Sequence, residues 1–167
     1  MKGTLQFDFL VNKENNTLTI VREFKASKNL VWDCYTKSEL LNQWFSPSPL
    51  TTKKKSMDFR EGGHWHYVMI DPEGPEYWGR TDYLKIQDQK FYTALDAFSN
   101  EAGEVNEELP RAEWLVSFMD KGNNAIVETI VTYNSLEDLE AVIQMGMKEG
   151  LSSALERLDD LLLALEI

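Results

Sequence analysis

The sequence has very few of the residues that usually bind metals or act as nucleophiles. Among its 167 residues are one cysteine, Cys34, and two histidines, His64 and His66. A single cysteine cannot form a disulfide within the chain, so we expect a protein of the reducing cytoplasm. The chain also lacks a serine-hydrolase elbow, an HExxH zinc pattern and a phosphate-binding loop with its lysine. No motif indicates a cofactor or a covalent catalyst.

Long apolar runs and positive charge are scarce as well. The longest apolar stretches, such as LLLAL, are too short to cross a bilayer, and the first residues show no secretory pattern. The net charge is −11 and the pI is about 4.6. Charge of this sign repels phosphate backbones and anionic lipids, so we expect neither nucleic acid binding nor membrane insertion. The short basic run 53–55 is expected in a solvated loop or an edge strand.

What the chain does have is a regular alternation of apolar and polar residues. Since no linker divides the sequence, we expect one domain over residues 1–167. Short alternating stretches between turn residues predict strands at 5–11, 17–24, 51–59, 64–70, 77–86, 90–98, 112–120 and 125–133. No helix separates the later strands, so the sheet should be antiparallel. The acidic stretch 99–111 predicts a long surface loop.

Two short helices are predicted after the first strands. Ser27 can cap one, and Ser38 can cap a second that runs through Trp44 before Pro47 and Pro49 prevent its continuation.

A much longer helix is predicted at the end of the chain. Ser135 and Asp138 resemble a capping box, and an apolar stripe at spacings of three and four then continues to Leu165. This pattern predicts one helix of roughly 30 residues that lies against the sheet. Gly146 and Gly150 leave part of one helix face without side chains, so another group can approach closely there.

Several segments together resemble one protein family. The segments are REFKASKNLVWDCYTKSELLNQWF, MDFREGGHWHYVM and MGMKEGLSSALERLDDLL, and their order is also that of the family. The set spans residues 17–165 and is similar to the SRPBCC (START-like) superfamily, in the branch of the activator of the heat-shock-protein-90 ATPase. The resemblance implies an α+β helix-grip fold. In this fold a curved antiparallel β-sheet wraps around a long C-terminal α-helix, with two short helices after the first strands.

The same resemblance implies a hydrophobic cavity between the sheet and the long helix. Relatives bind lipids, polyketides or other small apolar molecules; some cyclise or hydrolyse them, and one branch binds a chaperone. Three positions depart from the family pattern: Ser27 replaces a proline, Phe45 a tryptophan, and Met147 a common aromatic residue. Phe45 and Met147 keep an apolar group in place, so these departures affect the shape of the cavity and not the fold.

The HWHYVM segment raises the question of a metal site. In a strand, His64 and His66 point to one face and could chelate a metal, but the chain offers no third histidine or second cysteine. The opposite face carries Trp65, Tyr67 and Met69, and burial of each is worth about 1.5–3 kcal/mol. We therefore predict that these three side chains point inward and that both histidines lie outside.

Two further residues have alternative interpretations. Arg22 shares a face with inward-pointing residues, so it either orients a ligand carboxylate through paired N–H groups or pairs with a carboxylate on a neighbouring strand. The ion pair is the favoured interpretation. Cys34, on the apolar face of a short helix, is expected to be a small buried residue.

The leading hypothesis is a binding protein, without catalytic residues, for a small hydrophobic ligand. Its predicted ligand contacts are Arg22, Trp44, Phe45, Trp65, Tyr67, Met69, Trp114, Phe118, Met147 and Leu151. One alternative is a cyclase- or hydrolase-type enzyme that uses Arg22, Tyr67 or Tyr83 for acid–base chemistry. Another is a chaperone-binding partner, which would need an exposed basic or apolar patch.

Overall fold

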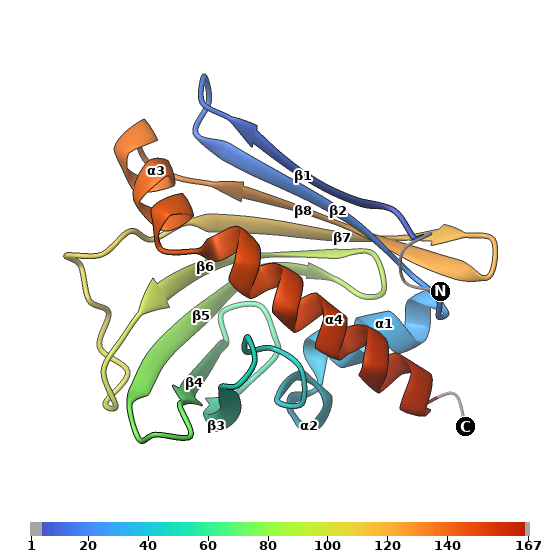
Figure 1. Cartoon of the computed structure of the whole chain (residues 1–167), viewed down its shortest axis with the longest axis horizontal. Helices are drawn as coiled ribbons and strands as arrows, with labels where there is room; N and C mark the ends of the chain where they lie inside the picture. Colours follow the sequence, from blue (N-terminus) through green and yellow to red (C-terminus); the bar gives the residue numbers. More distant parts are fainter. Residues whose placement is uncertain (1–4, 166–167) are drawn as a thin grey trace.

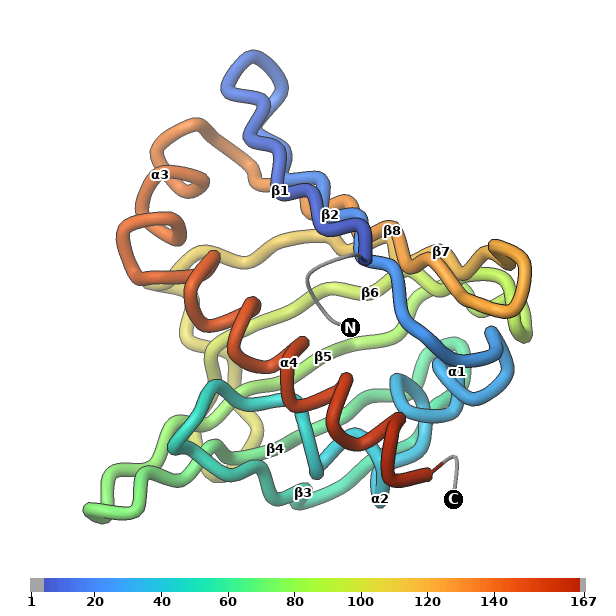
Figure 2. The backbone as a smooth tube through the Cα atoms, turned by 45° about the vertical axis from the view of Figure 1, so that its right-hand side comes forward, coloured from blue at the N-terminus to red at the C-terminus, as the bar shows by residue number. Residues whose placement is uncertain are grey.

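The computed structural model, which describes residues 5–165, has one eight-stranded antiparallel sheet that curves around the C-terminal helix (Figures 1 and 2). The strands are β1 (Phe7–Asn12), β2 (Thr17–Phe24), β3 (Thr51–Met57), β4 (His64–Ile70), β5 (Glu76–Gln87), β6 (Phe91–Phe98), β7 (Glu113–Lys121) and β8 (Asn124–Thr132). Their order in the sheet is β1-β2-β8-β7-β6-β5-β4-β3. The predicted fold class is confirmed, and the basic run 53–55 lies on the edge strand β3.

Two short helices, α1 (Lys28–Thr36) and α2 (Ser38–Leu41), follow β2 as predicted. The Oγ of Ser27 accepts a hydrogen bond from the backbone N–H of Leu30, so this cap is confirmed. Helix α2 is shorter than predicted, because the chain continues in turns through Trp44 and Ser38 is its first residue, not its cap. The Trp44 Nε1–H donates to the backbone oxygen of Cys34 at 2.9 Å, which ties this turn to α1.

The C-terminal segment forms two helices and not the single one predicted. Helix α3 (Leu136–Gln144) and helix α4 (Met147–Leu165) are separated at Gly146, whose φ is +89°. This left-handed conformation suits glycine because it has no Cβ, and it ends a helix. The predicted cap at Ser135 is confirmed, since its side chain accepts the N–H of Asp138. Pro47 packs over Gly150, but an added Cβ would lie 3.8 Å from it, so the close approach predicted at this glycine is not found.

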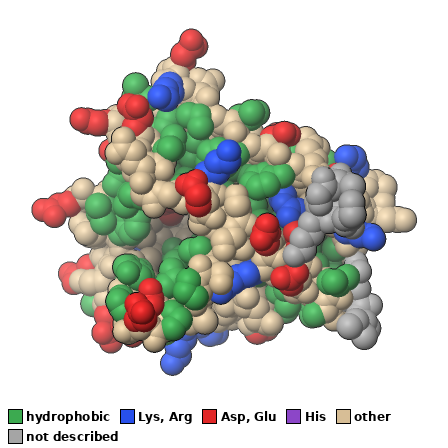
Figure 3. Space-filling model, in the orientation of Figure 1, with side chains coloured by type: hydrophobic (Ala, Val, Ile, Leu, Met, Phe, Trp, Pro, Cys, Tyr) green, Lys and Arg blue, Asp and Glu red, His purple; other side chains and the backbone are tan. Residues whose placement is uncertain are grey.

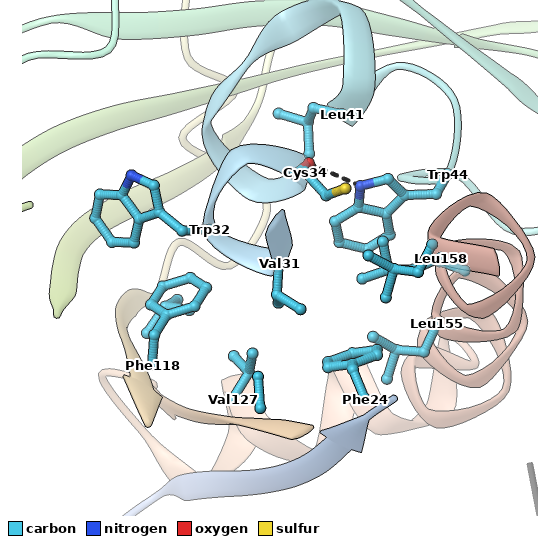
Figure 4. Packing of buried hydrophobic residues seen from close by; sticks show 14 of the residues in the cluster. Phe24, Val31, Trp32, Cys34, Leu41, Trp44, Phe118, Val127, Leu155 and Leu158 are labelled. Atoms are coloured by element: carbon cyan, nitrogen blue, oxygen red, sulfur yellow. Dashed lines mark hydrogen bonds between the residues drawn. The ribbon is translucent and has the colours of Figure 1, made fainter. Parts of the chain in front are cut away.

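Helix α1 fills one end of the concave face of the sheet. It packs against β7, β8 and α4, and the resulting core is shown in Figure 4. Its labelled side chains are nearly inaccessible to solvent: Phe24, Val31, Trp32, Cys34, Leu41, Trp44, Phe118, Val127, Leu155 and Leu158. Burial raises the pKa of the Cys34 thiol to about 11, which fits the predicted role as a small buried residue.

Helix α3 covers a different part of the sheet. Its Leu139 is fully buried against Leu18, Val131 and Tyr133, so α3 packs over β2 and β8. Of the helices, α4 is the one that crosses the middle strands, with the segment after α2 beside it (Figure 2). Among the described residues, no helix has both the length and the apolar character needed to span a membrane.

Candidate functional site

The concave face of the sheet is hollow beneath the N-terminal half of α4. The cavity has a volume of about 590 Å³, and most of its walls are aromatic or aliphatic side chains. It opens to the surface beside Tyr77, Phe98 and Met145, which are 54%, 40% and 55% exposed. Figure 3 shows this hollow with apolar side chains around it. The cavity therefore has an apolar interior and an apolar mouth.

Most of the residues predicted to contact a ligand come together around this cavity. Those on its walls are Arg22, Trp44, Phe45, Trp65, Tyr67, Met69, Trp114, Met147 and Leu151. Phe118 is absent from the walls, which corrects the prediction. It lies in the core at the α1 end, with its ring centroid 4.9 Å from that of Trp32 and 5.2 Å from that of Tyr35.

One wall of the cavity is a group of three aromatic rings. Trp65 and Tyr67 stack with centroids 4.1 Å apart, and Phe45 meets both rings edge-on. Tyr67 pairs across the sheet with Gly79, where an added Cβ would lie only 2.5 Å from the Tyr67 hydroxyl oxygen. Gly79 therefore provides the space in which the Tyr67 ring lies flat against the sheet. The inward orientation predicted for Trp65 and Tyr67 is confirmed.

The two histidines lie on the other face of the sheet and have separate partners. The Nε2 of His64 is 3.3 Å from the Ser56 Oγ, whereas the Nε2 of His66 is 3.0 Å from the backbone oxygen of Asn100. The prediction that both histidines lie outside the cavity is therefore confirmed, but His66 packs on Trp78 and is only 5% exposed, so it is not in contact with solvent.

The cause of this burial is the acidic loop after β6, which folds back over the outer face of the sheet. The Lys55 Nζ donates to the backbone oxygen of Glu101 at 2.6 Å, and Arg80 donates to that of Gly103 at 3.2 Å. Within residues 5–165, no three histidine, cysteine or carboxylate side chains are grouped as metal ligands. Each imidazole is therefore held by its own hydrogen-bond partner, Ser56 for His64 and Asn100 for His66, and the two histidines do not act as a pair.

Arg22 lies on the inner wall of the cavity, and its charge is paired. Its Nη2 forms an ion pair with Asp159, and the two side chains are 7% and 8% exposed. The guanidinium also lies 4.9 Å above the ring centroid of Phe24. The predicted ion pair is present, but its partner belongs to α4 and not to a neighbouring strand. Strand periodicity cannot identify a partner from a helix more than a hundred residues away in the sequence.

Six tyrosines line the cavity, of which Tyr67 and Tyr83 were the acid–base candidates in the sequence. Tyr77 is exposed at the mouth, and the five deeper ones are Tyr35, Tyr67, Tyr83, Tyr92 and Tyr133. Burial raises the pKa of every one of these phenols, so all five stay protonated at neutral pH. The Tyr133 hydroxyl lies 3.5 Å from the Met147 Sδ. The other four hydroxyls have no hydrogen-bond partner within residues 5–165, so they are free to bond to a molecule in the cavity.

Asp96 is the site residue that the sequence analysis missed. It lies on the cavity wall, where its Oδ1 accepts the N–H of Ala112 at 2.8 Å and its Oδ2 accepts the Trp114 Nε1–H at 2.7 Å. Burial raises the pKa of this carboxyl group, and its charge in turn raises the pKa of Tyr67 and Tyr133. The alternation Ala94, Asp96, Phe98 along β6 is the signal that could have revealed it.

Comparison with known proteins agrees with the fold. Residues 25–163 match the family described as activator of Hsp90 ATPase homolog 1-like protein. A search of the curated proteins finds no match.

Solved structures from several bacteria share the fold. Protein Ms6760 from Mycobacterium smegmatis is 29% identical with a TM-score of 0.86, over 95% of this chain and 96% of that one. A protein from Arthrobacter aurescens is 26% identical with a TM-score of 0.87, over 93% and 90%. The AHSA1 protein from Silicibacter pomeroyi shares the fold at 20% identity and a TM-score of 0.70, over 90% and 99%. The chain therefore belongs to the family of activator of Hsp90 ATPase homolog 1-like proteins, within the SRPBCC superfamily that its motifs predicted.

Proposed function

We propose that this protein binds a small, largely apolar molecule in the cavity between the sheet and α4. The observation that carries the proposal is an apolar cavity of about 590 Å³ that opens to the surface between the sheet and α4. Sites for small molecules typically measure about 300–1,000 Å³ and combine apolar walls with a few polar groups. The cavity has this size and this chemistry.

The walls suit a flat or ring-shaped apolar molecule. Phe45, Trp65 and Tyr67 present aromatic surface on one side, and Met147 and Leu151 of α4 present flexible and aliphatic surface on another. Each square ångström of apolar ligand surface removed from water contributes about 25 cal/mol. We propose these residues as the apolar contacts of the ligand.

The polar groups of the cavity favour binding over catalysis. The deeper cavity tyrosines stay protonated, so they can donate or accept hydrogen bonds but cannot act as general bases at neutral pH. Arg22 is paired with Asp159 and also lies on the cavity wall. We propose that it shapes the inner wall and that its side chain contacts the ligand while the ion pair stays intact.

A cavity-filling substitution tests the proposal. Leu151→Trp places a larger side chain in the cavity, and Leu163→Trp makes the same change on the 67% exposed face of the same helix. The probe is pyrenemethanol, whose binding is followed by fluorescence anisotropy. Native mass spectrometry of freshly purified protein is run in parallel to detect a copurified small molecule.

We expect the wild type and Leu163→Trp to bind the probe with equal affinity and Leu151→Trp to bind it at least about tenfold more weakly, a difference of about 1.4 kcal/mol. Any copurified molecule should be retained by the first two proteins and lost from the third. Equal probe binding by all three proteins, or no binding by the wild type, would show that the cavity is not the binding site.

A further inference from the structure

Asp96 is an ionisable group on the wall of a largely apolar cavity, and its carboxylate forms no direct ion pair, since Arg22 on the same wall is paired with Asp159. Its two oxygens each accept one N–H, from Ala112 and from the Trp114 indole, and these donors hold the carboxylate in place. A carboxylate can accept about four hydrogen bonds, so each oxygen has acceptor capacity left. Within residues 5–165 no lysine, arginine or histidine forms an ion pair with it.

The nearest candidate for a counter-ion is Arg111, and it is engaged elsewhere. Its Nη2 pairs with the carboxylate of Asp82, and its Nε donates to the backbone oxygen of Asp96 at 2.9 Å. The guanidinium therefore supports the strand that carries Asp96 and forms no direct ion pair with its carboxylate, although its positive charge partly offsets the rise in the pKa of Asp96 that burial causes. A buried carboxylate without a cation is costly, and a cation supplied from the cavity would offset that cost.

The surroundings of Asp96 in the cavity suit an organic cation. Tyr67 and Tyr133 line the same cavity as Asp96. Burial raises the pKa of both phenols, and the charge of Asp96 raises it further. A neutral hydroxyl can accept a hydrogen bond from an ammonium group. The aromatic faces of Trp65 and Trp114 also line the cavity, and the face of an aromatic ring attracts a cation.

The mouth of the cavity carries charge of the same sign as Asp96. Tyr77 at the mouth lies in the segment 71–79. Phe98 directly precedes the segment 99–110, which ends at the wall residue Pro110. Neither segment contains a lysine or an arginine. Their acidic residues are Asp71, Glu73, Glu76, Glu107 and Glu108, whereas Glu101 and Glu104 belong to the part of the loop that folds over the outer face of the sheet. Figure 3 shows acidic side chains on this side of the hollow. Such a rim attracts cations and repels anions as they approach.

We propose that the ligand is an apolar amine whose ammonium group pairs with Asp96 while its hydrocarbon part fills the aromatic cavity. This inference rests on the proposed function, and it adds a ligand class and a residue that selects for it. An anionic ligand of the same shape would meet Asp96 and the acidic rim. A neutral alcohol would keep the hydrogen bond to Asp96 without the charge.

Three probes of equal shape separate these classes: pyrenemethylamine, pyrenemethanol and pyrenecarboxylate. Their binding is measured by fluorescence anisotropy on the wild type, on Asp96→Asn and on Glu113→Gln. Asn keeps the shape of the side chain and removes its charge. Glu113→Gln makes the same change in net charge at an exposed residue on β7, away from the cavity. Circular dichroism checks that each variant is folded.

For the wild type we expect the amine to bind at least about tenfold more tightly than the alcohol, because hydrogen bonds between charged groups are stronger than those between neutral groups. The carboxylate should bind most weakly. Asp96→Asn should lower the affinity for the amine to that for the alcohol, and Glu113→Gln should keep the wild-type order. If Asp96→Asn does not fold, the order of the three probes on the wild type is still decisive.

Two results would overturn the inference. One is equal or tighter binding of the alcohol or the carboxylate by the wild type, and the other is an amine preference that survives in folded Asp96→Asn. In both cases the probes still bind, so the proposed function stands. Failure of all three probes to bind the wild type would instead overturn the proposed function together with this inference.

Discussion

The two ends of the concave sheet face differ in how they are covered. At one end, α1 inserts Val31 and Trp32 against β7 and β8, and these side chains are at most 4% exposed. At the other end, α3 packs to one side and the middle strands enclose an open cavity whose mouth exposes Tyr77 and Met145. The same sheet thus has a filled end, defined by the core around α1, and a hollow end, defined by the cavity. We infer that the filled end supplies stability and the hollow end supplies binding.

The difference originates in what each helix offers to the sheet. Helix α1 carries bulky side chains that point into the concave face, and Trp32 meets Phe59, Tyr92 and Phe118 edge-on. Helix α3 has one fully buried residue, Leu139, which packs over β2 and β8. Nothing from α3 therefore fills the space over β4, β5 and β6 except the residues at its C-terminal end.

The largest effect is expected at alkaline pH, where the buried tyrosines of the cavity, two of which also pack against the core around α1, should limit stability. The five deeper cavity tyrosines have a pKa raised above the ordinary value of 10, so they keep their protons in the folded state after the unfolded chain has lost them. Stability is therefore fully present below pH 10 and falls as the pH rises further. At pH 11 each of these tyrosines lowers the free energy of unfolding by about 1.4 kcal/mol. Together, the five losses approach the total stability of a domain.

Urea unfolding at a series of pH values measures this loss, and tyrosinate absorbance in native and unfolded protein identifies the groups. Ionisation of all the tyrosines near pH 10 in the folded protein would indicate that the hollow end is filled with water, and the contrast between the two ends would then disappear.

Arg22 joins the two ends, because it lines the cavity and also packs on Phe24 of the filled end. We expect Arg22→Met to lower the free energy of unfolding by about 3–5 kcal/mol, because it leaves Asp159 buried and unpaired. The double variant Arg22→Met/Asp159→Leu should recover most of this loss. Urea denaturation measures both. A loss below about 1 kcal/mol in the single variant would contradict a buried, paired arginine.

Truncation of two leucines on α4 allows the packing at the two ends to be compared directly. Leu158→Ala, in the filled end, should cost about 2–5 kcal/mol because it leaves a void in a close-packed core. Leu151→Ala, seven residues earlier and facing the cavity, should cost less than about 2 kcal/mol, because part of its side chain already borders open space. Urea denaturation gives both values. Equal costs would show that the hollow end is as well packed as the filled end.

The smallest effect is expected from a single methyl group at the hollow end. Gly79→Ala should destabilise the protein by about 1–3 kcal/mol and weaken binding of pyrenemethanol, because the new Cβ would push the Tyr67 ring towards the cavity. Gly150→Ala is the matched control. Its Cβ would lie 3.8 Å from Pro47, which is an ordinary contact. Alanine also stabilises a helix by about 1 kcal/mol relative to glycine. Thermal unfolding and anisotropy separate the two variants, and equal behaviour would contradict the role assigned to Gly79.

The strands, the first cap and the family could be predicted because their signals are local. Alternation identified which residues of β4 face inward, and that is why Trp65 and Tyr67 were placed correctly. Alternation does not say where along a strand the concave face is filled. Phe118 and Trp114 share a face of β7, yet one lies under α1 and the other lines the cavity.

The errors arose where distant segments meet. The apolar stripe continues across Gly146, so the sequence alone suggested one helix, although a left-handed residue turns the chain there. In the sequence Asp96 is an ordinary strand carboxylate. Its two N–H donors are Trp114 of β7 and Ala112 just before β7, and both are distant from Asp96 in the sequence. His66 is buried by a loop whose contacts are mostly through backbone oxygens, which carry no sequence pattern.

The distribution of the five tryptophans gives the molecule built-in optical reporters. Trp44, Trp65 and Trp114 line the cavity, Trp32 lies in the filled end, and Trp78 lies on the outer face beneath the loop after β6. A chromophore that enters the cavity should accept excitation energy mainly from the first three. Converting those three to phenylalanine, one at a time, would locate the bound molecule within the cavity without any added label.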